Sequence, residues 1–131
     1  MTTLTTRAML SLAALAVIAS ACGGSDTEIS VTASEFQFSP NSWSVAADTD
    51  IAVSFTNDGA VEHEWAVLRE GVTISSEEEF NEDIVLLEIE AQPVGTTVTE
   101  TFSFAPGTYQ VICALDGHFD AGMTGTLTVG G

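Results

Sequence analysis

One short stretch of the chain carries three residues whose side chains can bind a metal. The segment CALDGHFDAGM contains Cys113, His118 and Met123, with four residues between each and the next. All three types are rare here, because the whole sequence has 2 cysteines, 2 histidines and 3 methionines. Thiolate and thioether are soft ligands that suit Cu(I), and imidazole also suits copper. The spacing predicts a metal-binding loop, with chance clustering as the alternative.

His63 is the other histidine and supplies a fourth candidate ligand. It begins an alternating segment, HEWAVL, shortly after the turn-like stretch NDGA. In a two-sheet sandwich this turn and the 113–123 loop can lie at the same end. A trigonal set of two histidines and one cysteine, with a weak axial methionine, suits a mononuclear electron-transfer copper site. We therefore treat His63, Cys113, His118 and Met123 as one candidate metal set.

Zinc and simple burial are the competing interpretations. A structural zinc site takes a fourth strong ligand and is usually built from paired Cys-x-x-Cys or His-x-x-x-His spacings, which this sequence lacks. Taken singly, His63 and Met123 are more often ordinary buried residues, and Cys113 can be a small buried thiol. A thiolate-bridged centre of two coppers is excluded, because the expected domain has one cysteine.

The first 21 residues have the pattern of an export signal. Residues 1–7 carry one positive charge and no acid, and the alanine-rich apolar run that follows is too short to span a bilayer permanently. The small residues directly before Cys22 resemble the lipobox of bacterial lipoproteins, in which the cysteine becomes the lipid-modified N-terminus. Ala19 stands where leucine is more usual, so cleavage elsewhere without a lipid is the alternative.

These features predict three parts: a signal peptide over residues 1–21, a lipid-anchored tether over 22–27, and one domain over 28–131. The protein is expected to be exported, periplasmic or at the cell surface, and held to a membrane through lipid on Cys22. Two cysteines in an exported protein would ordinarily pair. Lipidation of Cys22 would instead leave Cys113 as a lone thiol in an oxidising compartment, where a bound metal could occupy it.

The expected mature chain is strongly acidic. The sequence has 2 Lys or Arg and 19 Asp or Glu, and Arg7 leaves with the signal, so 1 minus 19 gives a charge of −18. Such a charge repels nucleic acid and anionic lipid surfaces and attracts a basic protein partner, less strongly as salt rises. General adaptation to a saline medium is the alternative explanation.

Short segments of alternating apolar and polar residues predict β-strands through most of the domain. The clearest of these segments are residues 28–36, 51–57, 63–68, 108–113 and 124–129. Turn residues separate them, and the pattern indicates an all-β, antiparallel sandwich or barrel. In this arrangement Cys113 ends a strand on its core-facing side.

Residues 72–94 interrupt the alternation. The stretch SSEEEF predicts one short helix near residues 75–82, with a capping box from Ser76 to Glu79. The glutamates Glu77–Glu79 are expected to form its solvated first turn. The segment IVLLEIEA that follows is predicted to be a strand because it begins with β-branched residues.

The segment PGTYQVICALDGHFDAGMTGTLTV, residues 106–129, resembles the C-terminal signature of the cupredoxins, the small blue copper proteins that include plastocyanin, azurin and auracyanin. In that family a Pro-Gly-x-Tyr strand leads to Cys, His and Met on one loop. The upstream segment FTNDGAVEHEWAVL resembles the family's other ligand segment, where an Asn-containing turn precedes the first histidine. The resemblance implies a Greek-key β-sandwich, one copper per chain at His63, Cys113, His118 and Met123, and one-electron shuttling outside the cytoplasm.

Two positions depart from the family pattern. Glu64 follows the first histidine where many cupredoxins have asparagine, and Asp116 precedes Gly117 where proline is common. Residues around the ligands orient them and tune the metal. The departures therefore concern the reduction potential and the hydrogen bonds of the site rather than the identity of the metal.

We expect an electron carrier with no catalytic residues, because a copper oxidase or nitrite reductase needs further copper sites and no spare histidines exist to form one. A copper-binding or copper-delivery protein without physiological electron transfer is the alternative.

The expected partner is a redox protein, either a basic c-type cytochrome or a membrane oxidoreductase. A monomer would meet it through a patch around Leu115, His118 and Phe119. Trp43, Trp65 and also Phe119 are expected to be core or site-shielding residues.

Overall fold

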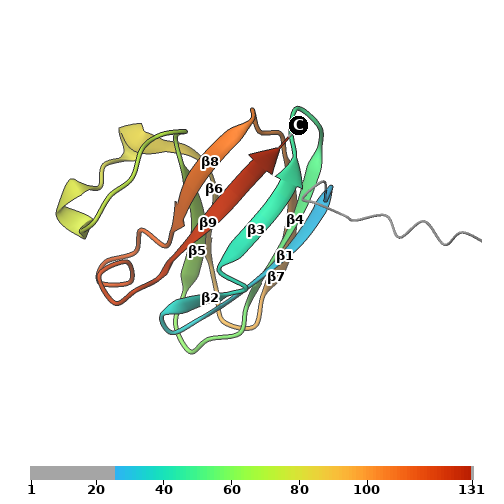
Figure 1. Cartoon of the computed structure of the whole chain (residues 1–131). Helices are drawn as coiled ribbons and strands as arrows, with labels where there is room; N and C mark the ends of the chain where they lie inside the picture. Colours follow the sequence, from blue (N-terminus) through green and yellow to red (C-terminus); the bar gives the residue numbers. More distant parts are fainter. Residues whose placement is uncertain (1–25, 131) are drawn as a thin grey trace, which may run out of the picture.

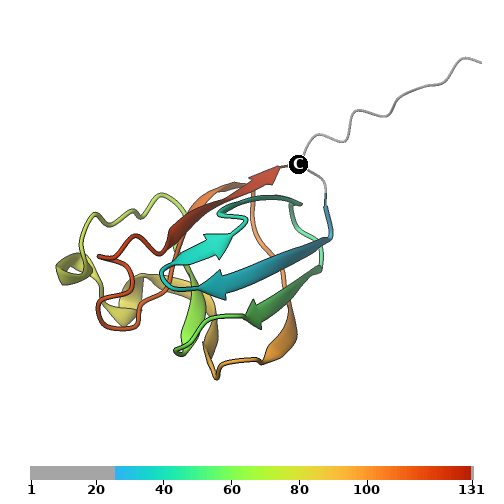
Figure 2. The same ribbon diagram turned by 90° about the horizontal axis from the view of Figure 1, so that it is seen from below.

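The computed structural model describes residues 26–130, so the expected signal peptide and Cys22 lie outside the described residues. Within this range the chain forms nine strands in two sheets, and Figures 1 and 2 show the sheets facing each other as the two layers of a sandwich. The predicted β-sandwich is therefore confirmed. No helical segment in residues 26–130 has the length and apolar character needed to cross a membrane.

The first sheet has four strands in the order β2-β1-β4-β7. They are β1 (Glu28–Ser34), β2 (Gln37–Ser39), β4 (Ile51–Asn57) and β7 (Thr97–Phe102). The second sheet has five strands in the order β3-β9-β8-β5-β6. They are β3 (Ser42–Ala46), β5 (His63–Leu68), β6 (Val85–Gln92), β8 (Gly107–Ile112) and β9 (Thr124–Gly130). The expected strand over IVLLEIEA is thus present as β6.

The pairing is mixed rather than wholly antiparallel. Most neighbouring strands run antiparallel, but β1 pairs with β4 and β3 pairs with β9 in parallel. The strands of each parallel pair are not consecutive in the sequence, because the chain passes from the first sheet to the second between β2 and β3. Alternation reports which face of a strand is buried, and it carries no information on the direction of the partner strand.

The core lies between the sheets and follows the predicted alternation. On β1 and β4 the inward residues are Ile29, Val31, Ala33, Ile51, Val53 and Phe55, all buried. The two tryptophans also lie in this core, where the rings of Trp43 and Trp65 meet edge to face with centroids 5.9 Å apart. Aromatic pairs prefer this geometry. The expectation that both tryptophans are core residues is confirmed.

Strand β5 is buried on both faces, although its alternation suggested one exposed face. Ala66 and Leu68 point away from the main core but are covered by the segment 69–84, which crosses the outside of the sheet. Gln110 on β8 fastens this segment, because its side-chain amide accepts a hydrogen bond from the Ile74 amide at 2.8 Å and donates one to the Ile74 carbonyl at 3.2 Å. A second, smaller apolar cluster forms beneath it.

The short helix expected near residues 75–82 is present as two separate 3-10 turns, η1 (Glu77–Glu79) and η2 (Glu82–Ile84). The expected capping box does not form, because the Ser76 side chain makes no cap hydrogen bond. The Glu79 carboxylate instead accepts the Ser75 amide at 2.6 Å. Neither turn contains a fully buried residue, although Ile84 of η2 packs against the apolar cluster beneath the segment. Turns of three residues are too short to be stable as an α-helix.

The start of the domain is tied to the sandwich before β1 begins. The carbonyl of Asp26 accepts a hydrogen bond from the Ala46 amide at 3.0 Å, and that of Thr27 accepts one from the Ala52 amide at 2.9 Å. Two residues of the expected tether thus contact the sheets through their backbone. Strand β9 ends at the end of the sandwich opposite the 113–123 loop (Figure 1).

Candidate metal centre

The sandwich brings the four candidate ligands together from two neighbouring strands and one loop. His63 is the first residue of β5, and Cys113 directly follows β8. These strands are antiparallel neighbours with Ala66 opposite Ile112, so the beginning of β5 lies beside the end of β8. His118 and Met123 lie in the loop that returns from β8 to β9.

Three of the four residues place their ligand atoms around a common point. The donor atoms of His63, Cys113 and His118 all lie within 4.8 Å of one another. The Sγ atom of Cys113 is 3.3 Å from Nδ1 of His118, and the centroids of the two imidazole rings are 5.0 Å apart. One metal ion could therefore bind all three side chains. Donors of this kind, two imidazoles and a thiolate, suit copper.

The ligand loop is held in shape by its own backbone. The amide of Cys113 donates to the Met123 carbonyl at 3.2 Å, and the amide of Met123 donates to the His118 carbonyl at 3.1 Å. The Met123 side chain is fully buried in the same core cluster as Cys113. Gly117 and Gly122 have φ values of 82° and 108°, a region that favours glycine. The two glycines therefore let the loop fold back over the site.

His63 has one ring nitrogen without a protein partner. Its side chain is completely buried, and Nδ1 makes no hydrogen bond with the described residues. Nε2, in contrast, lies 3.0 Å from Oε1 of Glu35. A buried polar atom left without a partner costs about 1–3 kcal/mol. A metal ion bound at Nδ1 would remove this cost, so the residues present fit a copper ion.

The thiol of Cys113 is protonated at neutral pH when no metal is bound. Burial raises its pKa to about 11, against a smaller lowering by hydrogen bonds from backbone amides that include Glu64 at 3.5 Å. Metal binding requires the thiolate. Burial also lowers the pKa of His118, with a further lowering from His63, and this keeps the imidazole neutral and able to bind a metal.

Residues 25–130 match the family of copper binding proteins of the plastocyanin/azurin type. The chain belongs to this cupredoxin family. It is 29% identical over 119 residues to auracyanin-B of Chloroflexus aurantiacus, which covers 78% of this chain, and it spans about half (51%) of that protein's length.

Solved structures agree with this assignment at the level of the fold. A reduced auracyanin from Roseiflexus castenholzii has a TM-score of 0.72 at 22% identity, with 82% of this chain and 100% of that chain covered. An azurin from Methylomonas sp. strain J has a TM-score of 0.64 at 20% identity, with 79% and 98% covered. The cofactor of this cupredoxin is accordingly one copper, and the His-Cys-His-Met cluster fits a copper electron carrier.

Asn57 supports the first ligand segment of the cupredoxin, as the resemblance of FTNDGAVEHEWAVL implied. Its buried side chain donates to the carbonyls of Val61 and Gln92 at 2.8 Å each and accepts the Gly59 amide at 2.9 Å. These bonds connect the end of β4 to the loop before His63 and to the end of β6. Two of the bonds therefore tie the turn to Asn57, and the third joins the end of β4 to the end of β6.

Glu64 occupies the place where many cupredoxins have asparagine, and it retains a connection to the second ligand segment. Its Oε1 accepts the Ala114 amide at 2.7 Å, while its own amide donates to Sγ of Cys113 at 3.5 Å. Burial raises the pKa of Glu64, and repulsion from Glu88 and Glu82 adds to the increase. The carboxylate thus bridges the two ligand segments in a partly buried, negatively charged setting.

Glu77 also has a role that the sequence did not reveal. It was expected to be solvated, yet its carboxylate accepts the Gly117 amide at 2.9 Å and the Asp120 amide at 3.3 Å. The Glu77 amide in turn donates to Oδ1 of Asp120 at 3.0 Å. Both views place the 69–84 segment beside the ligand loop (Figures 1 and 2). This segment therefore clamps the loop that carries His118.

The surface around His118 differs from the expected patch. Phe119 is buried, with 8% of its surface exposed, in the cluster under the 69–84 segment, so its place in a docking patch was wrong while its place in the core is confirmed. Phe36, in the turn between β1 and β2, is 40% exposed and meets the His118 ring edge-on at a centroid distance of 4.9 Å. Leu115 is partly buried. The sequence pattern could not predict that Phe36 lies beside His118, because the two residues are far apart in the chain.

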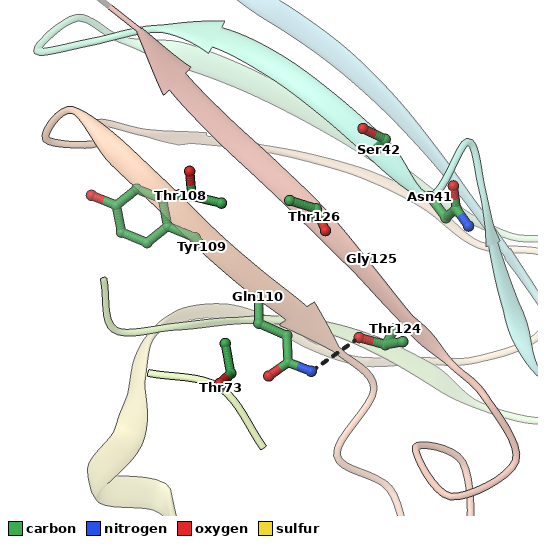
Figure 3. Close-up of a pocket in the computed structure, with 9 residues that line it drawn as sticks. All are labelled: Asn41, Ser42, Thr73, Thr108, Tyr109, Gln110, Thr124, Gly125 and Thr126. Atoms are coloured by element: carbon green, nitrogen blue, oxygen red, sulfur yellow. Dashed lines mark hydrogen bonds between the residues drawn. The ribbon is translucent and has the colours of Figure 1, made fainter. Parts of the chain in front are cut away.

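An open groove lies elsewhere, on the outer face of the five-stranded sheet along β8 and β9 (Figure 3). Its lining is rich in hydroxyl and amide groups, among them Thr73, Thr108, Gln110, Thr124 and Thr126. None of the four candidate metal ligands lines it. The groove is therefore separate from the copper centre.

Proposed function

We propose that this cupredoxin is an extracytoplasmic one-electron carrier in which His63, Cys113, His118 and Met123 would hold one copper ion, with Met123 as the weakest of the four ligands. The main support for this proposal is Nδ1 of His63, which is buried without a hydrogen-bond partner in the cluster that also contains Cys113 and His118. Copper, when bound, supplies the Cu(I)/Cu(II) couple. The chain supplies a mixed donor set of soft sulfur and imidazole nitrogen, which suits both oxidation states.

The scaffold favours electron transfer over chemistry on a substrate. The candidate ligands lie on sheet ends and on a loop that is hydrogen-bonded to itself and to Glu77, so little movement is expected when the oxidation state changes. His63, Cys113 and Met123 are fully buried, whereas His118 is partly exposed. His118 is therefore the ligand through which an electron would pass to a partner. Phe36 and Leu115 beside it provide apolar contact surface.

The partner we propose is a basic redox protein, such as a c-type cytochrome or a membrane oxidoreductase. The charge of −18 after Cys22 would speed the encounter with a basic surface at low salt. The surface around His118, which includes Phe36 and Leu115, would then form the final contact. We further propose that lipid on Cys22 holds the domain to a membrane after export, with the residues between Cys22 and Asp26 as the tether, because Asp26 and Thr27 are bonded to the sandwich.

The visible spectrum of the copper-loaded domain tests the function. The oxidised protein should be intensely blue with one copper per chain, because a short thiolate bond from Cys113 gives a strong charge-transfer band, and it should bleach and recover reversibly on reduction and oxidation. Cys113→Ser should lose the colour. A colourless wild type in oxidant contradicts the site. A blue protein that releases copper readily and exchanges no electron with redox proteins points to copper delivery.

Location is tested separately in cells. Wild type should be recovered with membranes and carry a lipid on Cys22, and a Cys22→Ala precursor should lose that attachment. A mature protein that begins at a residue other than Cys22 and carries no lipid contradicts the anchor and leaves the copper assignment intact.

A further inference from the structure

Three donors converge on one carboxylate oxygen next to the site. Oε1 of Glu35 accepts the amide of Ala60 at 2.7 Å and the amide of Val61 at 3.1 Å, and it lies 3.0 Å from Nε2 of His63. Glu35 belongs to the turn between β1 and β2, while the three donors belong to the loop and strand start that carry the first ligand. A single side chain therefore joins a distant turn to this ligand segment.

The position of the carboxylate determines which nitrogen of His63 carries the proton. An ionised carboxylate can only accept hydrogen bonds, so the contact at 3.0 Å requires a proton on Nε2. The Ala60 and Val61 amides hold the oxygen in place, and they also stabilise its ionised form. In the neutral imidazole Nδ1 then keeps its lone pair. This is the atom that is buried without a partner.

The close packing of the loop supports the same arrangement. A Cβ atom added at Gly59 would come within 2.8 Å of Nε2 of His63 and into direct collision with Oε1 of Glu35. The backbone at this point therefore passes directly beside the contact between carboxylate and imidazole. A larger residue here would have to displace the Glu35 carboxylate or the His63 ring, so Gly59 favours this contact by leaving room for it.

We propose that Glu35 is a positioning residue that sets the Nε2-protonated tautomer of His63 and, through its negative charge, favours Cu(II) over Cu(I). A carboxylate behind a ligating histidine fixes the ring and raises the basicity of the nitrogen that binds the metal. The more highly charged oxidation state gains more from a nearby anion. This inference rests on the proposed copper site at Nδ1 of His63.

Solvent weakens this effect without removing it. The Glu35 side chain is 34% exposed, so water screens its long-range field. The imidazole side of the pair is completely buried, and the interaction acts through a direct hydrogen bond rather than across solvent. We therefore expect an effect on the copper that a neighbouring exposed carboxylate without this bond does not produce.

Three variants separate charge from hydrogen bonding. Glu35→Gln retains an oxygen that can accept from Nε2 but removes the charge, and Glu35→Ala removes both. Glu62→Gln is the matched control, because Glu62 is an exposed glutamate directly before His63. Reduction potentials of the copper-loaded proteins are measured by redox titration. The His63 tautomer is read from imidazole 15N chemical shifts in the metal-free domain.

Glu35→Gln should stay blue with a higher potential, equivalent to about a tenfold weaker preference for Cu(II), or about 59 mV for one electron. Glu62→Gln should shift it far less. Metal-free wild type should carry the His63 proton on Nε2, and Glu35→Ala should populate both tautomers. Equal shifts in Glu35→Gln and Glu62→Gln, or a wild-type proton on Nδ1, would overturn the proposal. A wild type that is not blue would refute the proposed function instead, while the tautomer measurement would still test Glu35.

Discussion

The carboxylate of Glu77 accepts the amide of Gly117, the residue directly before His118, at 2.9 Å. The two residues lie 40 positions apart in the chain, and they meet because the 69–84 segment folds across the outside of the second sheet. A cupredoxin ligand loop is thereby fastened from outside the sandwich. The contact predicts that a residue which touches neither copper nor ligand side chains affects copper retention.

Glu77→Ala should release copper faster, by up to about tenfold, because the Gly117 and Asp120 amides lose their acceptor. Loss of blue absorbance in the presence of a chelator measures this rate. The exposed neighbour offers a control, Glu78→Ala, which should behave as wild type. Equal release rates for wild type and Glu77→Ala would show that the clamp is unimportant.

The same contact has a pH signature. The hydrogen bond from Gly117 lowers the pKa of Glu77 below its ordinary value of 4.5. A carboxylate with a lowered pKa in the folded state stabilises the fold when the pH is above the pKa of the unfolded chain. This contribution is lost as the pH falls through the folded-state pKa. The difference in melting temperature between metal-free wild type and Glu77→Ala should therefore be constant near neutral pH and shrink below about pH 4.5. A difference that does not change over this range would contradict the linkage.

Glu64 should respond differently to its two simplest replacements. Glu64→Gln keeps an acceptor for the Ala114 amide and removes a partly buried negative charge. Burial disfavours that charge, as the raised pKa of Glu64 indicates, so the variant should be at least as stable as wild type at neutral pH. The difference in stability between Glu64→Gln and wild type should shrink as the pH falls, because protonation of Glu64 removes the cost of burying its charge. Glu64→Ala should lose about 1 kcal/mol of unfolding free energy, measured in urea. A Glu64→Gln variant as unstable as Glu64→Ala would show that the charge itself is needed.

Copper binding should release a proton from Cys113. Its pKa of about 11 means that the thiol of the metal-free protein is protonated at pH 8, whereas the copper-bound form is a thiolate. Adding Cu(I) at pH 8 in weakly buffered solution should release about one proton per copper, and apparent affinity should rise about tenfold per pH unit below the thiol pKa. Cys113→Ser should show no such release. Proton-free binding in wild type would exclude the thiolate ligand.

Met123→Leu should keep the copper and the blue colour while raising the reduction potential. The axial ligand tunes the potential more than it holds the metal, and an apolar replacement disfavours the more highly charged Cu(II). Met123 is fully buried, and leucine has a similar volume, so the fold should lose less than about 1.5 kcal/mol. Redox titration and a copper assay check both points. Complete copper loss would instead make Met123 a primary ligand.

The surface beside His118 should control electron transfer with a basic partner. Phe36→Glu and Leu115→Lys should slow reduction by a basic cytochrome without changing the spectrum, because each replaces apolar contact surface near His118 with a charged group that is costly to desolvate, and the lysine at position 115 also repels a basic partner. Raising the salt concentration should slow wild type as well. A rate indifferent to salt and to both variants would favour the saline-habitat explanation of the acidity.

Much of this protein could be predicted from the order of its residues, because the relevant signals are local. Alternation identified β1, β4, β5, β8 and β9 and the face of each that points into the main core, since a side chain's face depends only on its position in a strand. The loop from Cys113 to Met123, and a histidine opening another strand, were sufficient to nominate the donor set. His63 begins one strand and Cys113 follows another, and antiparallel pairing of these two strands places the two residues side by side.

Other features were decided only by tertiary contacts, because they depend on residues far apart in the chain meeting in space. They are the direction of the β1–β4 and β3–β9 pairs, the burial of Phe119, and the attachment of Glu35 and Glu77. Exposed glutamates in an acidic chain have no sequence pattern that separates a hydrogen-bonded carboxylate from a solvated one. The local sequence thus determined which side chains could bind copper, and the packing of distant loops decided which carboxylates surround them.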